Sequence, residues 1–230
     1  MSLPIVVSSM HDHQPEGRPG VGALQSPRSA RRAPLRAVSG RTLVLPQENI
    51  DTDQIVPARF LLESARADWS DTLFAGWRFD ASGREREDSP LAGVEPGSRP
   101  VLVAARNFGC GSSREHAAWA LRDFGVRAVI APSLADIFRR NALKNGVLAF
   151  EVDAAVHARL AAAESEVAID LQSRTLVLED GTAVEFAIDA FARHCLLEGL
   201  DELDFLCRQE GRIAAFEAAS PRRSLRVPAR

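Results

Sequence analysis

The sequence has few of the features that mark metal-binding, membrane or nucleic-acid-binding proteins. Only three of its 230 residues are cysteines, Cys110, Cys195 and Cys207. They show no C-x-x-C spacing and no histidine at ligand spacing, so this chain alone is not expected to hold zinc or an iron–sulfur cluster. The sparse set fits a reducing cytosol and predicts a cytoplasmic protein. No apolar run approaches the roughly 20 residues of a membrane span. The net charge of −3 favours neither nucleic acid nor an anionic membrane as a partner.

The order of apolar runs predicts a single mixed α/β domain. A chain of this length, 46% hydrophobic, suffices for one substantial core. Strands expected at 41–45, 101–105, 126–131 and 147–152 alternate with helices expected at 117–124, 134–143 and 153–163, which indicates a parallel sheet with flanking helices. Runs at 166–171, 175–178 and 183–188 alternate around Asp180-Gly181 and predict antiparallel hairpin strands. A helix from Asp189 to Glu198 follows, then a helical stretch 203–219 with a break near Gly211.

Two boundaries divide the chain into three segments. Residues 1–40 are rich in Pro, Ser and Arg without periodicity, which predicts a disordered extension. The domain is expected over 41–219, with a frayed tail at 220–230. Within the domain, 67–100 is long, polar and turn-rich, and its aromatic residues Trp69, Phe74, Trp77 and Phe79 are expected to anchor it.

The stretch Asn107–His116, N-F-G-C-G-S-S-R-E-H, is a strand-to-helix turn. Gly109 and Gly111 permit positive φ and a close approach to a ligand. Ser112 and Glu115 fit an S-x-x-E capping box, which places Ser112 at or next to the N-cap of the following helix. Arg114 adds a planar cation suited to a carboxylate or phosphate. The turn therefore predicts an anion-binding site.

Common nucleotide-binding and nucleophile motifs fit this turn poorly. A dinucleotide fingerprint requires a third glycine where Arg114 stands, and a Walker A loop requires a Gly-Lys pair. A capped helix with a buried Cys110 is the simpler structural alternative for any one of these residues.

The whole string, however, resembles the signature of small subunits of 3-isopropylmalate dehydratase, which correspond to the swivelling C-terminal domain of aconitase-type hydro-lyases. Segments 50–61, 129–138 and 188–195 are similar to further family segments in the same order. The resemblance covers about 41–216 and implies a swivelling β/β/α domain.

The resemblance also implies roles for individual residues. Ser112 would be the base that removes a C–H proton, and Arg114 would bind a substrate carboxylate with help from Ser113 and Gly111. Asp53, in the acidic turn that also carries Asp51, would help to set protonation. Without the resemblance, ordinary turn chemistry is the preferred explanation of both carboxylates.

Two more assignments follow from the same resemblance. Phe60 and Leu61 would border the part of the substrate that varies between relatives, although core residues would look identical. His116 would buttress the turn or serve as a structural histidine.

The implied reaction interconverts 2-isopropylmalate and 3-isopropylmalate through 2-isopropylmaleate in leucine biosynthesis. It requires a Lewis acid, which the family carries as a four-iron, four-sulfur cluster on a separate large subunit, so a heterodimer or heterotetramer is expected. Two alternatives stay open: a related small subunit, of homoaconitase or of a methylmalate (citraconate) dehydratase, and a non-catalytic anion-binding module.

Overall fold

The structure, a computed structural model, describes residues 32–62 and 66–219. The expected disorder of residues 1–31 and the expected fraying of 220–230 lie outside the described residues. The elements, in chain order, are β1 Ala37–Leu45, α1 Thr52–Ile55, η1 Ala58–Leu62, η2 Ser70–Thr72, α2 Ala75–Arg78, β2 Val101–Ala104, α3 Glu115–Phe124, β3 Ala128–Ala131, α4 Asp136–Lys144, β4 Leu148–Glu151, α5 Ala154–Ala161, β5 Glu166–Asp170, β6 Thr175–Val177, β7 Ala183–Glu185, α6 Ala190–Glu198, α7 Glu202–Arg208 and α8 Glu210–Ala219.

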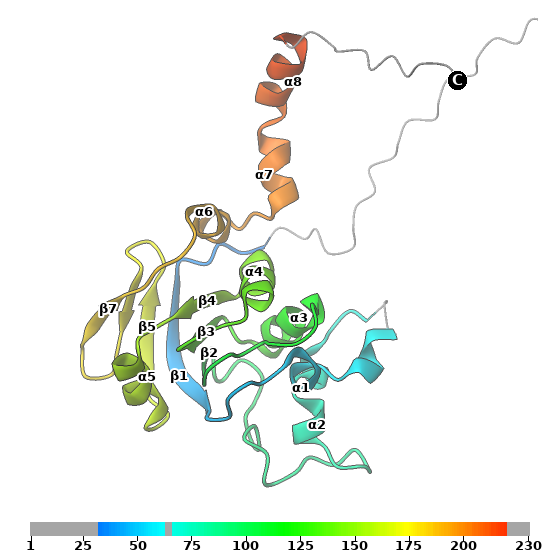
Figure 1. Cartoon of the computed structure of the whole chain (residues 1–230), viewed down its shortest axis with the longest axis vertical. Coiled ribbons are helices and arrows are strands. Elements are labelled where there is room, and N and C mark those ends of the chain that lie inside the picture. The colour runs from blue at the N-terminus through cyan, green and yellow to red at the C-terminus, as the bar shows by residue number, and fades with distance from the viewer. Residues whose placement is uncertain (1–31, 63–65, 220–230) are drawn as a thin grey trace, which may run out of the picture. The chain divides into compact units, whose positions relative to one another are not determined.

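Within the described residues, seven strands form one mixed sheet in the order β4-β3-β2-β1-β5-β6-β7 (Figure 1). Strand β1 joins its two halves. Residues 42–45 of β1 pair in parallel with β2, and residues 37–41 pair antiparallel with β5. Strands β3 and β4 continue the parallel half, and β6 and β7 continue the antiparallel half. The mixed α/β domain predicted from the sequence is confirmed.

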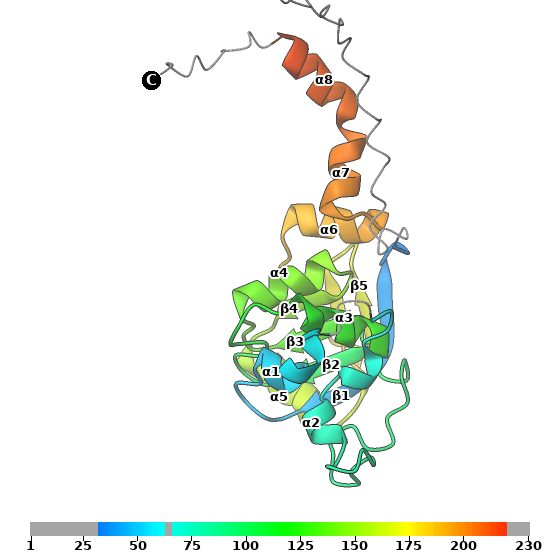
Figure 2. The ribbon, with the colours of Figure 1, turned by 90° about the vertical axis from the view of Figure 1, so that its right-hand side faces the viewer.

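Both faces of the parallel strands are buried, and neighbouring residues of one strand enter different cores. In β2, Leu102 and Ala104 join the core beneath α3 and α4, whereas Val101 and Val103 join the core beneath α5 and α6. This two-sided burial explains why these strands read as continuous apolar runs. Figure 2 shows α1, α3 and α4 in front of the parallel strands.

The domain begins earlier than the sequence predicts. Strand β1 starts at Ala37, whereas the expected strand starts at Arg41. Val38 is buried in the core beneath α6, and the Leu35 amide donates to the Leu196 carbonyl at 2.9 Å. Periodicity missed this first half of β1 because Val38 is the one buried residue among 37–41 and Gly40 lies within the segment.

The long segment 67–100 is held by its aromatic residues, as predicted. Trp69 and Phe74 are fully buried in the core beneath α3. Trp77 stacks on Phe74 with ring centroids 4.9 Å apart. Near the C-terminus, the helix break predicted near Gly211 is confirmed: α7 ends at Arg208, Gln209 is its C-cap, and α8 begins at Glu210.

Candidate active site

The loops that follow β1 and β2 run side by side beyond the carboxyl ends of these parallel strands. The Asn49 amide donates to the Arg106 carbonyl at 2.9 Å, and the Gly109 amide donates to the Ile50 carbonyl at 2.7 Å. The Thr52 amide donates to the Cys110 carbonyl at 2.9 Å. These hydrogen bonds join the acidic turn and the signature turn into one structure. It lies at the edge of an open α/β sheet where ligands generally bind.

Two asparagines turn the chain at the base of the paired loops. Asn49 and Asn107 both have left-handed backbones, with φ of 56° and 57°. Asn tolerates this conformation better than other residues with a Cβ. The Asn107 side-chain amide donates to the Asn49 side-chain oxygen at 2.9 Å, which ties the two turns together.

The N-terminus of α4 is attached to the same loops through Ser133. The Ser133 hydroxyl accepts from the Asn107 amide at 2.9 Å, and the Ala135 amide donates to the Phe108 carbonyl at 3.0 Å. In the sequence, Ser133 directly precedes the helix expected at 134–143 and was predicted to cap it. That prediction is wrong, because α4 begins at Asp136 with Ala135 as its N-cap and no side-chain cap. The serine is used to join α4 to the signature turn instead.

The two glycines of the signature turn have different neighbours. Gly109 has φ +76°, and a Cβ added there would lie 2.2 Å from Cγ of Phe138, a buried core residue. Gly111 has φ +87°, and its added Cβ would meet Cβ of Asp51 at 3.4 Å. The lack of a side chain at Gly109 therefore leaves room for the Phe138 ring, and at Gly111 it leaves room beside Asp51. The sequence predicted instead that both glycines permit the close approach of a ligand.

Helix α3 is not capped by Ser112, so the predicted capping box is wrong. The helix begins at Glu115, its N-cap is Arg114, and no side chain caps it. The Glu115 carboxylate accepts instead from the side-chain amide of Asn145 at 2.8 Å. The same Asn145, 3% exposed, accepts from the Trp119 indole at 2.9 Å. Glu115 is thus used to join α3 to the end of α4, and the Ser112 hydroxyl is not needed as a cap.

Ser112 lies on the rim of a cavity of about 330 Å³. The cavity is lined by Thr52, Gly109, Gly111, Ser112, Arg114, Ala135, Asp136, Ile137, Phe138 and Asn141. Buried Thr52 fixes the turn from below, since its hydroxyl donates to the Ser112 carbonyl at 2.8 Å. Gly111, Ser112 and Ser113 are exposed, and within the described chain neither serine hydroxyl makes a hydrogen bond. Two hydroxyls are therefore available to a ligand.

Arg114 is oriented by α1 and its C-cap residue. Its Nη1 donates to the Asp53 carboxylate and, at 3.1 Å, to the Val56 carbonyl. The side chain is 16% exposed and lines the cavity. Both of these bonds to the described residues use Nη1, so Nε and Nη2 can still form two parallel bonds to a carboxylate.

Asp53 holds Arg114 and also closes its own turn. Its carboxylate accepts from Arg114 and, at 2.8 Å, from the Ala58 amide. The hydrogen bond from Arg114 is the main reason that the pKa of Asp53 is lowered, and the Ala58 amide contributes. Asp51 is the N-cap of α1 in a complete capping box with Gln54. The structure thus uses Asp51 for turn chemistry and Asp53 for both turn chemistry and the arginine.

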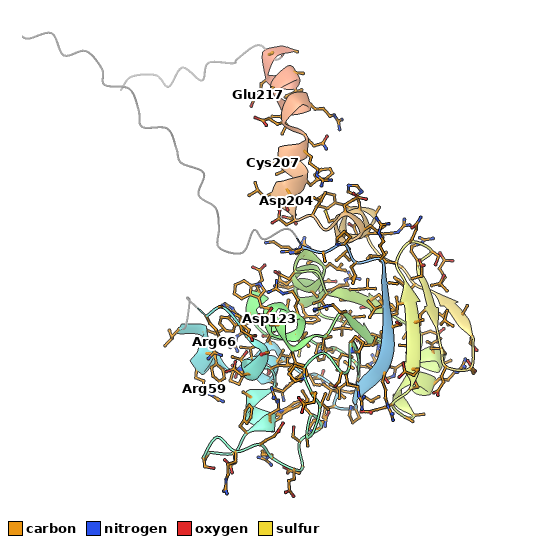
Figure 3. The ribbon with its side chains drawn as sticks, turned by 180° about the vertical axis from the view of Figure 1, so that it is seen from behind. Arg59, Arg66, Asp123, Asp204, Cys207 and Glu217 are labelled. Atoms are coloured by element: carbon orange, nitrogen blue, oxygen red, sulfur yellow. The ribbon has the colours of Figure 1, made fainter. Side chains whose placement is uncertain are left out.

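Phe60 and Leu61 are placed away from this cavity. Both are partly buried against the core, and neither is among the lining residues. The guanidinium carbons of Arg59 and Arg66 lie 4.6 and 5.5 Å from the centroid of the Phe60 ring. Figure 3 shows these two arginines on the same segment. A substrate contact of Phe60 and Leu61 stays a prediction.

His116 packs in an aromatic cluster. Its ring centroid lies 4.7 Å from that of Trp69 and 4.5 Å from that of Trp119. The cluster fixes the first turn of α3 against the segment 67–100, which agrees with the structural alternative for this histidine.

No group of three or more His, Cys, Asp or Glu that could hold a metal occurs within 32–62 and 66–219. Cys110 lies in the signature turn and Cys195 in α6. Cys207 lies in α7 (Figure 3). Burial, followed by the charge of Asp51, raises the pKa of the Cys110 thiol. None of the helices in the described part is both long and apolar enough to cross a membrane.

A larger hollow of about 740 Å³ lies between α4 and α6. Its wall includes Arg140, Leu143, Ile188 and Leu200, and none of the residues of the signature turn. The smaller cavity is the better candidate because Ser112 and the oriented Arg114 both line it.

Comparison with known proteins assigns this arrangement to a family. A family model described as the aconitase C-terminal domain matches residues 33–155. The 3-isopropylmalate dehydratase small subunit of Anaeromyxobacter dehalogenans strain 2CP-1 is 53% identical over 185 residues, which cover 80% of this chain and 97% of that relative. The chain belongs to the family of 3-isopropylmalate dehydratase small subunits. The predicted resemblance is confirmed.

Further small subunits of 3-isopropylmalate dehydratase agree. That of Chloroflexus aurantiacus strain J-10-fl is 49% identical over 193 residues, which cover 82% of this chain and 96% of the relative. The crystal structure of 3-isopropylmalate dehydratase from Methanocaldococcus jannaschii has a TM-score of 0.59 and 28% identity, and the match covers 79% of this chain and 99% of that one. Every residue that lines the cavity falls within the segment matched to the aconitase C-terminal domain.

Sequence reasoning missed part of this site. Thr52 lies between the two aspartates of the acidic turn and was not predicted to line a site. Ile137 and Asn141 were predicted only as part of the helix expected at 134–143. Their spacing of i and i+4 puts them on one face of α4. The rule that loops gather at the carboxyl ends of parallel strands was the signal that could have added this face to the site.

Proposed function

We propose that this chain is the small subunit of a hydro-lyase that interconverts 2-isopropylmalate and 3-isopropylmalate through 2-isopropylmaleate in leucine biosynthesis. The observation that carries the proposal is the meeting of the Ser112 hydroxyl and the oriented Arg114 guanidinium in one cavity. The names of the relatives supply the substrate class.

Arg114 binds one substrate carboxylate in this proposal. A planar guanidinium can donate two parallel hydrogen bonds, and Asp53 and Val56 hold it through Nη1 alone. The exposed Ser113 hydroxyl and the backbone at Gly111 lie beside it in the same turn. Asp53 acts through Arg114: its lowered pKa keeps it ionised near neutral pH, so it orients the arginine and does not donate a proton.

Ser112 removes the proton in the dehydration half-reaction. The serine oxygen, as an alkoxide, takes the proton from the carbon next to the one that bears the hydroxyl. The electron pair of the C–H bond forms the alkene, the C–O bond breaks, and the hydroxyl group leaves as hydroxide. Transfer of the proton from the Ser112 hydroxyl to this hydroxide would then give water and restore the alkoxide. Hydration runs the same steps in reverse and adds the hydroxyl to the other carbon. A serine hydroxyl is a weak acid, so this role requires a site that stabilises anions and excludes water.

The exposure of Gly111, Ser112 and Ser113 in this chain supports a second part of the proposal. An alkoxide would be protonated by bulk water, so the turn requires a cover before it can act. We assign that cover to a large subunit in a cytoplasmic heterodimer or heterotetramer. The four-iron, four-sulfur cluster of the partner would supply the Lewis acid for the leaving hydroxyl, since the described residues of this chain offer no ligand set for it.

The test is an isomerisation assay of this chain co-expressed with its large subunit and purified without oxygen. The pair should convert 2-isopropylmalate to 3-isopropylmalate, and neither subunit alone should do so. A pair that is inactive on isopropylmalate but active on a homologous tricarboxylate or on methylmalate would refute the assigned substrate. Tight dicarboxylate binding by the isolated chain, with no turnover by the pair, would instead support a non-catalytic binding module.

A further inference from the structure

The side chain of Asn145 lies buried between α3 and the end of α4, where it is the C-cap. It is 3% exposed, and among the described residues it is the one buried side-chain amide. Its oxygen accepts from the Trp119 indole at 2.9 Å. Its nitrogen donates to the Glu115 carboxylate and to the Asn141 carbonyl, both at 2.8 Å. Both donors of the amide are therefore used, as its burial requires.

These bonds join the beginning of α3 to the end of α4. Glu115 is the first residue of α3 and Trp119 lies four residues later, so the two side chains lie on one face of the helix. Helix α4 is attached to the signature turn at its other end, where the Ala135 amide donates to the Phe108 carbonyl at 3.0 Å. Both ends of α4 are therefore linked to the segment 107–119, and Figure 2 shows the two helices side by side.

Arg114 is the residue through which this network reaches the cavity. It is the N-cap of α3, and its carbonyl accepts from the Ala117 amide at 3.2 Å. The next residue, Glu115, is held directly by Asn145. A shift of the first turn of α3 would therefore move the Arg114 backbone, whereas the bonds from Nη1 hold only the far end of its side chain.

Ser112 is held independently of this network. Its carbonyl accepts from the Thr52 hydroxyl at 2.8 Å, and it precedes α3 in the chain. The contact between α3 and α4 should therefore affect the binding of a carboxylate by Arg114 more than the removal of a proton by Ser112.

From this geometry we infer that Asn145 is a positioning residue for substrate binding. It sets the first turn of α3 so that Arg114 can form two parallel hydrogen bonds to a substrate carboxylate. Two parallel bonds require a more exact placement than one, because both N–H groups must point at the carboxylate at the same time. The inference rests on the proposed function and adds a residue that lies outside the cavity.

The test is Asn145→Asp in the assembled pair with its large subunit. The substitution preserves the shape of the side chain and the acceptor for Trp119, but it replaces the donor to Glu115 with an oxygen that repels that carboxylate. The KM for 2-isopropylmalate should rise about tenfold, because a small displacement of a binding group is sufficient for a loss of this size. The kcat should stay within a few-fold of wild type, since Ser112 is held separately.

The decisive arm of the test is rescue by Glu115→Gln. In the double variant, the glutamine amide donates to the new carboxylate, so the bond between α3 and α4 is restored with its direction reversed. The KM should then return to within about threefold of wild type. Glu115→Gln alone keeps an oxygen that accepts from Asn145, and its KM should also stay within about threefold of wild type.

Thr42→Val is the matched control for lost stability. Thr42 is fully buried in β1, and its hydroxyl accepts from the Ser165 amide at 3.0 Å. Like Asn145→Asp, this substitution keeps the shape of the side chain and breaks a buried hydrogen bond, so urea unfolding should show both variants destabilised. Only Asn145→Asp should raise the KM. An equal rise in both variants would leave Asn145 with a purely structural role and overturn the inference.

A wild-type KM in an assembled Asn145→Asp pair overturns the inference, and so does a raised KM that Glu115→Gln fails to restore. Should Asn145→Asp not assemble, Trp119→Phe replaces it, since it removes the indole donor and keeps an aromatic ring. The KM should rise in that variant too, and an unchanged value overturns the inference. A wild-type pair that does not turn over isopropylmalate refutes the proposed function itself before any variant is measured, so the two failures are distinguishable.

Discussion

Replacing Gly109 with alanine should destabilise the domain much more than the same change at an unobstructed glycine. Gly109 has φ +76°, where an alanine costs about 1–2 kcal/mol. Its new Cβ would also lie 2.2 to 2.7 Å from three atoms of Phe138. Phe138 is buried and cannot swing into solvent, so overpacking should add about 1–3 kcal/mol. The expected total for Gly109→Ala is about 2–5 kcal/mol.

Gly181 is the matched control for the backbone contribution. It has φ +82°, and a Cβ added there meets no described atom within 4 Å. Gly181→Ala should therefore cost only the backbone contribution of about 1–2 kcal/mol. Urea unfolding of the isolated chain, followed by circular dichroism, measures both free energies. Equal destabilisation of the two variants would refute the conclusion that Gly109 exists to admit Phe138.

Three further predictions concern the site. Arg114→Lys should raise the KM of the assembled pair at least about tenfold despite the retained charge, because lysine cannot form two parallel bonds to a carboxylate. Wild-type kinetics in this variant would contradict the assignment of Arg114 as a carboxylate-binding residue. Asp53→Asn should raise KM while changing the free energy of unfolding by less than about 1 kcal/mol, since the carboxylate is 56% exposed. Because the pKa of Asp53 is lowered, its ion pair with Arg114 is complete above the ordinary pKa of an aspartate and is lost only as the pH falls through the lowered value. The KM of the wild-type pair should therefore show no titration of Asp53 between about pH 6 and 8. A titration in that window would contradict the orienting role. Cys110, whose pKa is raised, should be alkylated by iodoacetamide at neutral pH more slowly than the exposed Cys207, and mass spectrometry that finds Cys110 modified first would contradict this.

Much of the fold could be predicted because apolar runs and helix ends are local properties. The parallel strands are buried on both faces and read as uninterrupted apolar segments. Asp153 and Asp189, the first residues of two expected helices, are the N-caps of α5 and α6, with side chains that accept from the amides of Val156 and Ala192. The hairpin strands around Asp180-Gly181 also form where predicted.

The failures occur where a side chain bonds outside its own helix. Ser133 and Glu115 carry the sequence pattern of caps, but one accepts from Asn107 and the other from Asn145. A local motif cannot reveal these partners, because they come from other strands and helices. The residues of α4 that line the cavity could not be predicted for the same reason. The position of Ile137 beside the signature turn depends on how α4 packs against Phe108 and Gly109.

The most direct test of the central claim is Ser112→Ala in the assembled pair. Because the N-cap of α3 is Arg114 and the Ser112 contact to Thr52 uses its backbone carbonyl, this substitution removes the hydroxyl without removing a cap. We expect a pair that forms normally, a KM within a few-fold of wild type, and a kcat lowered by about 10²–10⁴. Ser113→Ala should be milder. A Ser112→Ala pair that keeps its kcat, or a larger loss in Ser113→Ala, would contradict the assignment of Ser112 as the base.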